Sequence, residues 1–456
     1  MPEDPALPLP AAVPLATRPL GILGSAAVAR RNLLELIPEI ATRQPIVSGR
    51  TGIRWHMVMD PESNRRILRD RVDDYPKSEV TKLILGPAIG QSLFVAEGAH
   101  WRWQRRAAAP AFAQRNVAAL APVMTAAAER ASARLDAAVG RAANLFDEML
   151  AATFEVISDV TFSGDEGFDR AAVHRAIDAY LAQVARLSVL DIVGAPAWVP
   201  RPGRLRSGRV VREMRRIADA AITRRARTGA RPVPDLLDLM RAGADPETGR
   251  RMTTPELRDN LLTFIVAGHE TTALTLSWAL YLCAFDPAVQ ARARAEAQAV
   301  LGPRAATEAD IARLPLIRAI VDETLRLYPP AAFLSRTARA PDSLCGREVR
   351  PGDTIMLPIY ALHRHHLWWD NPHAFRPDRF LSGPRPDRFA FLPFGDGPRV
   401  CIGAAFALQE AVIVLATLLA RFRFAPVAGR APRPVLILTL RPEGGVWLGV
   451  ERADAD

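Results

Sequence analysis

Hydrophobic positions recur at helical spacing through most of this chain. From "HWRWQRRAAAPAF" to the middle of the sequence, Ala, Leu, Arg and Glu dominate at a period near 3.6 residues, which predicts helices. "PIVSGRTGIRWHMVMDP" has short β-type runs around a glycine-containing turn. Near the C-terminus, "PVLILTL" and "VWLGVER" flank "RPEGG", which predicts a β-hairpin. We therefore expect a mainly α fold with small β-sheets (α+β).

The first part of the chain differs from the rest in its prolines. "MPEDPALPLPAAVPLATRPL" is interrupted by proline throughout, and we expect an extended arm as far as about Ala29. No later shift in composition marks a second domain. The sequence predicts a proline-rich arm over residues 1–34 and a single large domain over residues 35–456.

One helix should cross the whole domain. In "TTPELRDNLLTFIVAGHETTALTLSWALYLCAFDP", Thr253 and Glu256 have capping-box spacing, and Pro287 ends the apolar pattern. A helix of about thirty residues is roughly 45 Å long. Nearly every face is apolar, so we expect it to be buried.

Charge and cysteine content exclude some classes of protein. The formal net charge is +10. The sequence contains no compact basic run with interleaved aromatics, so nucleic-acid binding is disfavoured. Binding to an acidic protein partner remains an open alternative. The acidic N-terminus is a poor signal peptide, and Glu270 in the middle of the long helix argues against a membrane span, so we expect no membrane anchor. Three isolated cysteines, Cys283, Cys345 and Cys401, predict a reducing compartment and a cytoplasmic protein.

"AGHETT" lies at the centre of the long helix. Ala267 and Gly268 are small, so another group can approach the backbone closely. Glu270 is an acid in apolar surroundings, and Thr271 is a neighbouring hydroxyl. An acid beside a hydroxyl can deliver protons, although a polar network that only satisfies itself would have the same sequence.

"FGDGPRVCIG" places a cysteine in a glycine-rich loop before another apolar helical run. A helix N-terminus and Arg399 both favour the thiolate of Cys401, which could be a nucleophile or a metal ligand. A Cys–His hydrolase would need a general base such as His269, and nothing in the sequence brings the two together. A buried cysteine without function is also compatible.

The loop resembles the haem-binding motif F-x-x-G-x-R-x-C-x-G of the cytochrome P-450 superfamily, in its soluble bacterial type. Phe394, Gly397, Arg399, Cys401 and Gly403 fill every fixed position. Two further motifs occur in the order that the family has them: "ETLR" and "FRPDRF". "AGHETT" resembles the family's oxygen-activation motif. The resemblance extends from about residue 35 to the end.

The resemblance assigns roles to these residues. It implies a haem b between the long central helix and the helix that follows the cysteine loop, with Cys401 as the axial iron ligand. The catalytic acid and alcohol would be Glu270 and Thr271, and a structural ion network would join Glu323, Arg326 and Arg379. The implied cofactor contacts are Trp101, Arg105, Ala267, Gly268, Arg336, Phe394, Gly395, Arg399, Cys401 and Gly403.

Trp101 and Arg105 are four residues apart in "HWRWQRR" and share one helix face. The family's W-x-x-x-R pattern holds a haem propionate there, and Arg336 and Arg399 resemble other propionate-binding arginines. An amphipathic surface helix is the alternative for Trp101 and Arg105.

The implied activity is insertion of one oxygen atom of O2 into a hydrophobic small molecule. Electrons would come from a separate acidic ferredoxin or flavodoxin with its reductase, and Arg102 and Arg106 are candidates for its docking surface. A peroxide-driven peroxygenase and a non-catalytic haem sensor are the alternatives. We expect a monomer.

"ALHRHH" lacks a fourth ligand at metal-site spacing, which favours a structural role for its histidines.

The substrate pocket should be apolar. Phe264, Ala267 and Thr271 share one helix face, and Phe333 and Leu334 are further candidates for its wall. Fatty acids, terpenoids, steroids and aromatics all fit this description.

Overall fold

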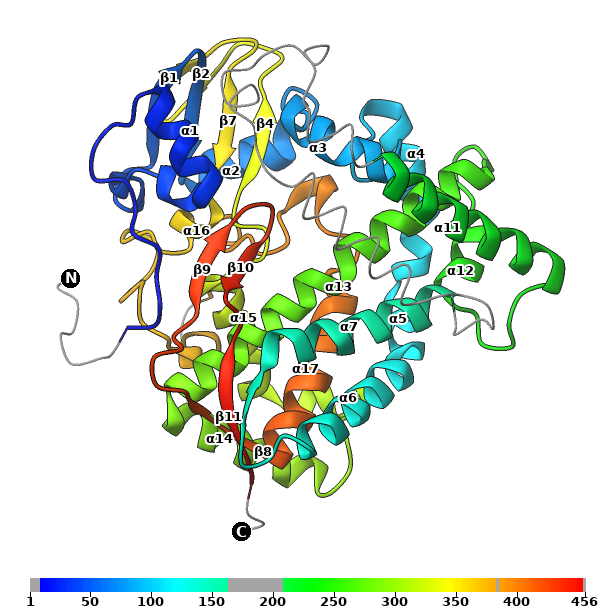
Figure 1. The fold of residues 1–456 in the computed structure, drawn as a ribbon. Helices are drawn as coiled ribbons and strands as arrows, with labels where there is room; N and C mark the ends of the chain where they lie inside the picture. Colours follow the sequence, from blue (N-terminus) through cyan, green and yellow to red (C-terminus); the bar gives the residue numbers. More distant parts are fainter. Residues whose placement is uncertain (1–8, 163–207, 383–384, 454–456) are drawn as a thin grey trace.

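A computed structural model describes residues 9–162, 208–382 and 385–453 of the chain. Helices surround one long central helix, α13, and the strands lie toward two edges (Figure 1). The predicted mainly α fold with small sheets is confirmed. The helices of the described residues are α1 (Ile22–Arg31), α2 (Pro61–Arg65), α3 (Glu79–Ile89), α4 (Gly98–Ala108), α5 (Gln114–Ala119), α6 (Ala121–Asp136), α7 (Leu145–Phe162), α11 (Gly208–Thr228), α12 (Leu236–Ala242), α13 (Thr254–Phe285), α14 (Pro287–Leu301), α15 (Pro315–Leu327), α16 (Ile359–Leu362) and α17 (Ala404–Arg421).

The sheets are small and mostly antiparallel. Within the described ranges their strand orders are β1-β2-β7-β4, β10-β9, β3-β11-β8 and β5-β6. Gly52 has a φ of 76° and makes the predicted turn between β1 and β2. The strands are β1 (Ile46–Thr51), β2 (Ile53–Val58), β3 (Ala142–Asn144), β4 (Leu334–Thr337), β5 (Asp342–Leu344), β6 (Arg347–Val349), β7 (Thr354–Leu357), β8 (Phe422–Pro426), β9 (Arg433–Leu436), β10 (Leu440–Glu443) and β11 (Trp447–Arg452).

Short helical turns connect these elements: η1 (Leu33–Leu36), η2 (Glu39–Thr42), η3 (Arg66–Asp70), η4 (Ala109–Phe112), η5 (Glu308–Arg313), η6 (Pro377–Phe380) and η7 (Gly397–Arg399).

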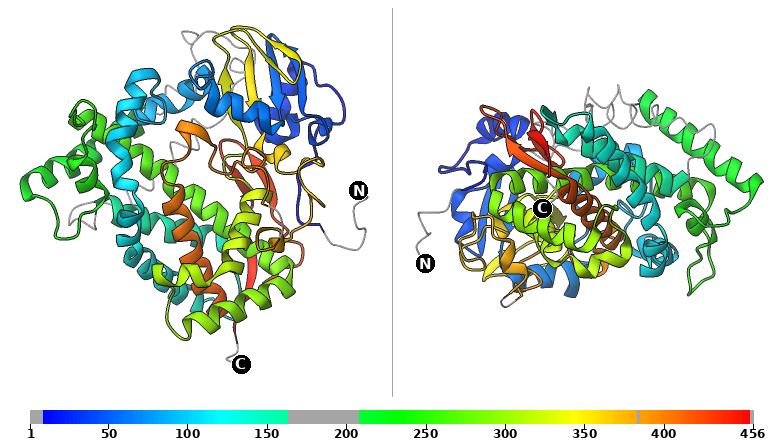
Figure 2. Two further views of the ribbon diagram at one scale, coloured as in Figure 1. Left: turned by 180° about the vertical axis from the view of Figure 1, so that it is seen from behind. Right: turned by 90° about the horizontal axis from the view of Figure 1, so that it is seen from below.

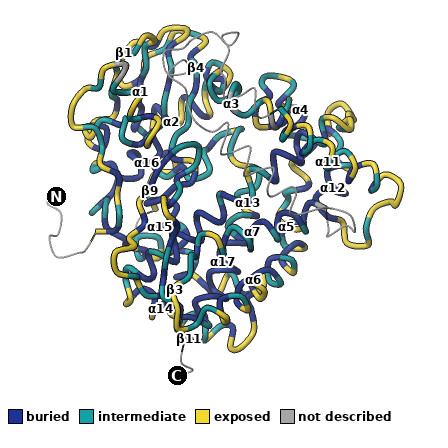
Figure 3. The backbone as a smooth tube through the Cα atoms, viewed as in Figure 1, coloured by how far each residue is buried: buried dark blue, intermediate teal, exposed yellow. Residues whose placement is uncertain are grey.

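Helix α13 has the length and the start that the sequence predicts. It contains 32 residues, and Thr253 and Glu256 form the capping box, with the Thr253 N–H 2.9 Å from Glu256 Oε2. Asp286 ends it and accepts hydrogen bonds from the first N–H groups of α14. Helices α7, α11, α15 and α17 pack around it, and Figures 2 and 3 show α13 and α17 inside the molecule, largely buried.

Two predictions about the ends of the chain are wrong. The arm is not extended as far as Ala29, because the proline-free stretch Ile22–Arg31 forms α1. The terminal strands on either side of "RPEGG" do not pair with each other: β10 pairs with β9, while β11 pairs with β8 and β3. Gly444 and Gly445, with φ of 81° and 86°, redirect the chain from one sheet to the other.

Three tyrosines hold the arm against the core. Tyr281 Oη accepts from the Ala11 N–H at 3.0 Å, Tyr328 Oη donates to the Ala11 carbonyl at 2.6 Å, and Tyr360 Oη accepts from the Val13 N–H at 3.0 Å. The tyrosines come from α13, the end of α15, and α16. The boundary between arm and domain at residue 34 stays a prediction.

Candidate active site

The cysteine loop is shaped by its glycines and by its neighbour η3. Gly395 and Gly397 have φ of 67° and 71°, a region that disfavours other residues. A Cβ on Gly397 would lie 2.1 Å from the Leu68 carbonyl oxygen, so this glycine lets the loop pack on η3. The Cys401 N–H donates to the Phe394 carbonyl at 3.0 Å, and α17 begins three residues later.

The thiol of Cys401 is enclosed by protein yet keeps accessible surface. Burial raises its pKa, and the Gly403 N–H, Arg105 and Lys77 oppose this effect only in part. The protein alone therefore does not produce a reactive low-pKa thiolate, whereas metal coordination would deprotonate the thiol. His269 packs its ring 5.8 Å from that of Phe154 on α7, and its Nδ1 lies 3.0 Å from the Ile265 carbonyl oxygen.

Four basic side chains gather near Cys401 around a single acid. Arg399 donates to the Ala96 carbonyl at 3.0 Å and forms an ion pair with Glu97. The Lys77 N–H donates to Glu97 Oε1 at 2.9 Å, and Lys77 forms an isolated β-bridge with Arg336. Neither Lys77 nor Glu97 lies in a recognisable motif, and sequence reasoning missed both.

The cluster lacks negative charge. Burial lowers the pKa of Arg336 to about 10, and its Nε has no hydrogen-bond partner. Burial, together with Arg336 and Arg399, holds the pKa of Lys77 well below its usual range. The guanidinium of Arg105 has no hydrogen-bond or ion-pair partner in the described part of the chain, and burial lowers its pKa. An anion would supply the partner that the Arg336 Nε and the Arg105 guanidinium lack.

Trp101 joins this cluster to the cysteine loop. It is buried in α4, and the Arg399 guanidinium lies 4.3 Å from the centre of its ring. Ile402 packs against Trp101, Leu93 and Ala96. Trp101 therefore occupies an internal position, and the alternative of a surface helix face is wrong for it.

The centre of α13 faces accessible space around Ala267. Ala267 is exposed, Val266 and Gly268 are half-buried, and Thr271 Oγ1 donates to the Ala267 carbonyl at 2.7 Å. A Cβ on Gly268 would lie 3.1 Å from Ile157 Cδ1 on α7, so its small size serves helix packing on that side. Its contact with a cofactor stays a prediction.

Glu270 is buried but engaged. Its Oε1 accepts from Thr439 Oγ1 at 2.9 Å and pairs with Arg441 of β10, whose side chain is 41% exposed. The carboxylate thus connects the centre of α13 to an arginine at the surface. Sequence reasoning missed Arg441, because its contact with Glu270 joins residues 171 positions apart.

The residues predicted for the pocket wall lie in different surroundings. Phe264 is buried with its ring edge-to-face on Phe112, at 5.0 Å between centroids. Leu334 lies beside the cysteine loop, since a Cβ on Gly395 would be 3.8 Å from it. Phe333 and Leu334 are half-buried and pack on the core.

The structure brings the three members of the ion network together. Glu323 accepts from Arg326 Nε and Nη2, both at 2.7 Å, and pairs with Arg379 Nε at 3.1 Å. The side chains of Glu323 and Arg326 are fully buried, so the network fixes the fold away from solvent.

The two arginines proposed for docking differ. Arg102 forms an exposed pair with Asp73 at 2.6 Å. Arg106 binds the fully buried Asp245 through two hydrogen bonds and holds the pKa of that carboxyl well below its usual range. Arg106 therefore has a structural role, which the sequence did not predict.

The described residues were also compared with the requirements of a metal-ion site and of a membrane-spanning helix. Within the described ranges, no three His, Cys, Asp or Glu side chains are arranged to hold a metal ion. Helix α17 is long and apolar enough to cross a membrane, but 67% of its apolar window is buried in the fold, as a core helix requires.

Comparison with known proteins identifies the class. The cytochrome P-450 family model matches residues 18–448. Cyclooctatin synthase of Streptomyces melanosporofaciens is 32% identical over 431 residues, covering 93% of both chains. Cyclooctat-9-en-7-ol 5-monooxygenase of the same organism is 32% identical over 420 residues, covering 90% of this chain and 88% of the relative. The crystal structure of the cytochrome P450DA haem domain matches with a TM-score of 0.78, 28% identity and 90% coverage of both chains.

The chain belongs to the cytochrome P-450 family. It is a haem-dependent monooxygenase of hydrophobic small molecules and works with a redox partner. The residues present fit haem: an accessible thiol stands next to a buried cation cluster that lacks the negative charge of two propionates.

Proposed function

We propose that Cys401 is the axial ligand of a haem b whose propionates are bound by Arg105, Arg336 and Arg399, with Trp101 stacked on Arg399. Lys77 lies beside this set: its backbone N–H donates to Glu97, and its ammonium donates to the Phe94 carbonyl at 2.5 Å. The observation that carries the proposal is the accessible thiol beside the buried, partnerless Arg336 Nε and the unpaired Arg105 guanidinium. When bound, haem supplies the activation of dioxygen and the transfer of one oxygen atom to substrate.

Thr271 and Glu270 are proposed to bind and transfer protons during the reaction. Thr271 gives its own proton to the Ala267 carbonyl, which leaves its oxygen lone pairs free to accept a hydrogen bond from the adjacent space. Glu270 is proposed to relay protons while its Oε1 is bound by Thr439 and Arg441. Ala267, Phe264, Phe333 and Leu334 are proposed to contact the substrate.

The test is spectroscopic. Cys401→Ser should abolish the red-shifted Soret band of the ferrous–CO complex while the folded helix content, measured by circular dichroism, stays unchanged. Survival of that band in the serine variant would falsify the assignment. Arg336→Gln in the same assay should keep the band but lower the haem content.

The finer identity of the electron donor is also a proposal. We propose an acidic ferredoxin or flavodoxin with its reductase, because the chain has a net charge of +10. Arg102 is the surviving candidate for its docking surface, since its pair with Asp73 is exposed and exchangeable. Arg102→Glu should slow reduction by ferredoxin at low salt, and turnover with peroxide alone should stay far below turnover with the donor.

We further propose a monomer with the domain over residues 35–456. We place it in a reducing compartment such as the cytoplasm, which is compatible with three free cysteines.

A further inference from the structure

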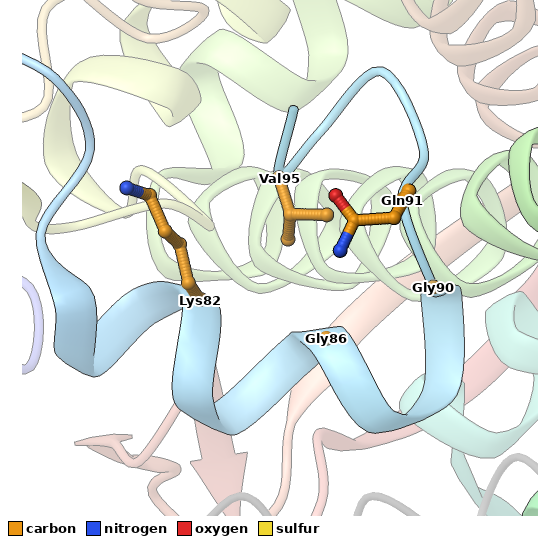
Figure 4. Close-up of a pocket in the computed structure, with 5 residues that line it drawn as sticks. All are labelled: Lys82, Gly86, Gly90, Gln91 and Val95. Atoms are coloured by element: carbon orange, nitrogen blue, oxygen red, sulfur yellow. The ribbon is translucent and has the colours of Figure 1, made fainter. Parts of the chain in front are cut away.

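A cavity of about 180 Å³ lies between α3 and the loop that follows it (Figure 4). Its lining residues are Lys82, Gly86, Gly90, Gln91 and Val95. Figure 4 shows Lys82, Gln91 and Val95 around the space beside α3. Sites that enclose a whole ligand measure about 300–1,000 Å³, so this cavity accommodates one end of a larger molecule.

The cavity lies close to the cation cluster. Val95 lines it, and the next two residues, Ala96 and Glu97, are the partners of Arg399. Arg399 stands two residues before Cys401. A molecule with one end in the cavity therefore has its remainder within reach of the space beside Cys401.

Lys82 is the charged group of the cavity wall. Its Nζ is 2.8 Å from Glu79 Oε1 and 4.0 Å from Glu97 Oε1. The Glu79 side chain is 81% exposed, so this pair is screened by water and exchanges at little cost. Glu97 is already bound by Arg399 and by the Lys77 N–H. Lys82 can therefore turn to an incoming anion.

A second cation lies over the same helix. Arg215 of α11 donates from Nη2 to the Pro87 carbonyl at 3.2 Å, and its Nε is buried without a hydrogen-bond partner. Pro87 follows Gly86, a lining residue. The acid nearest the other end of the cavity is Asp259, which accepts from the Gln91 N–H and is neutralised by Arg258 at 3.1 Å.

Lysine is exceptional in this chain. Of its 59 basic residues only two, Lys77 and Lys82, are lysines, and both lie on the side of the cavity and the cation cluster. The lysine ammonium is a compact charge on a flexible stem, whereas arginine makes fixed bidentate contacts. A flexible lysine can bind and release a charged ligand more readily than an arginine held by fixed bidentate contacts.

We propose that this cavity binds the carboxylate of the substrate, and that the enzyme oxidises amphipathic carboxylic acids whose hydrocarbon part extends toward Cys401. This inference rests on the proposed function and adds its substrate class. Lys82 is the specificity-determining residue, and Arg215 adds positive charge at the same helix.

The first experiment uses the haem-loaded enzyme and pairs of straight-chain acids and their methyl esters, from eight to sixteen carbons. Binding is followed by the spin-state shift of the Soret band. We expect the best-fitting acid to bind about tenfold tighter than its ester, and Lys82→Gln to remove that advantage while the affinity for the ester changes less than about twofold. Glu79→Gln is the matched control on the same helix and should not weaken acid binding.

The second experiment uses the two lysines directly. Acetylation with an amine-reactive reagent and mass spectrometry should show that the bound acid slows modification of Lys82, whereas the ester does not. Equal affinity for acid and ester, no shift with any acid, or no protection of Lys82 would overturn the proposal. These failures are distinct from failure of the proposed function, because the ferrous–CO band of Cys401 would persist in each case.

Discussion

Glu323→Gln is the substitution whose cost the structure defines best. The Glu323 carboxylate accepts four hydrogen bonds: two at 2.7 Å from Arg326, one at 3.1 Å from Arg379 Nε and one at 2.8 Å from the Arg376 N–H. Glutamine removes the negative charge and turns an amide N–H toward the guanidinium donors. Arg326 would then carry a fully buried charge without a counter-ion.

The rest of the surroundings softens this loss only in part. Arg326 keeps its hydrogen bonds to the carbonyl groups of His363, Pro372 and Ala374, at 2.8, 2.6 and 2.9 Å. Carbonyl dipoles do not replace a counter-charge. Removing one partner of a buried ion pair costs about 3–5 kcal/mol, a large share of a typical stability of about 5–15 kcal/mol.

The assay is urea unfolding of the variant and of wild type, followed by circular dichroism, with haem absorbance as a second probe. Because Arg326 ties α15 to residues 372–374, which precede the cysteine loop, we expect haem release at lower urea than loss of helix. Asp378→Asn is the control: its pair with Arg292, at 2.7 Å, is about half exposed on both sides and should cost at most about 1 kcal/mol. A loss below about 1 kcal/mol for Glu323→Gln would refute the reasoning.

Three further predictions concern the loop, the cation cluster and pH. Gly397→Ala places a Cβ 2.1 Å from the Leu68 carbonyl oxygen, in a backbone with positive φ. In urea unfolding it should destabilise the haem-free protein by about 1–3 kcal/mol. Gly403→Ala is the control and should stay near wild type, because its Cβ would meet nothing within 4 Å. Arg336→Leu should speed haem transfer to apomyoglobin about 10- to 100-fold. It should cost the haem-free protein at most about 1 kcal/mol, because Nε has no partner and Nη1 donates to the Ser335 carbonyl at 3.0 Å. Equal transfer rates would contradict its proposed role. Burial lowers the pKa of His363 from 6.5 to about 3. Between these two values the unfolded state binds a proton that the folded state excludes. The protein is therefore most stable above about pH 6.5 with respect to this group, and the free energy of unfolding falls as the pH drops toward 3. His363→Gln should reduce that slope by about 1.4 kcal/mol per pH unit between about pH 4 and 6, measured by urea unfolding at several pH values.

The sequence predicted local features well, because their physics is local. The capping box of Thr253 and Glu256 and the glycine turn between β1 and β2 depend on neighbours within a few residues. The resemblance to a known family assigned both Trp101 and Arg399 to haem propionates, and in the structure the Arg399 guanidinium lies 4.3 Å from the centre of the Trp101 ring. Periodicity alone could not have joined them.

What the sequence missed depends on contacts between distant segments. Glu97 and Lys77 belong to loops without a motif, so their place beside Arg336 followed only from the assembled fold. The packing of Gly268 against α7 was also missed, because such a contact leaves no periodic signal. Glu270 similarly acquires its partner Arg441 from a strand near the end of the chain.

The arm at the start of the chain shares its stability with the helix that carries Thr271. Tyr328 is fully buried, and its hydroxyl finds its acceptor on the backbone of Ala11. A protein that begins after Val13 would lose all three tyrosine contacts, each worth about 1 kcal/mol, and would leave the Tyr328 hydroxyl without that acceptor. Fusion of an electron-donor protein for self-sufficient catalysis should therefore be made at the carboxyl end, beyond β11, where the linker does not compete with the tyrosines for the arm.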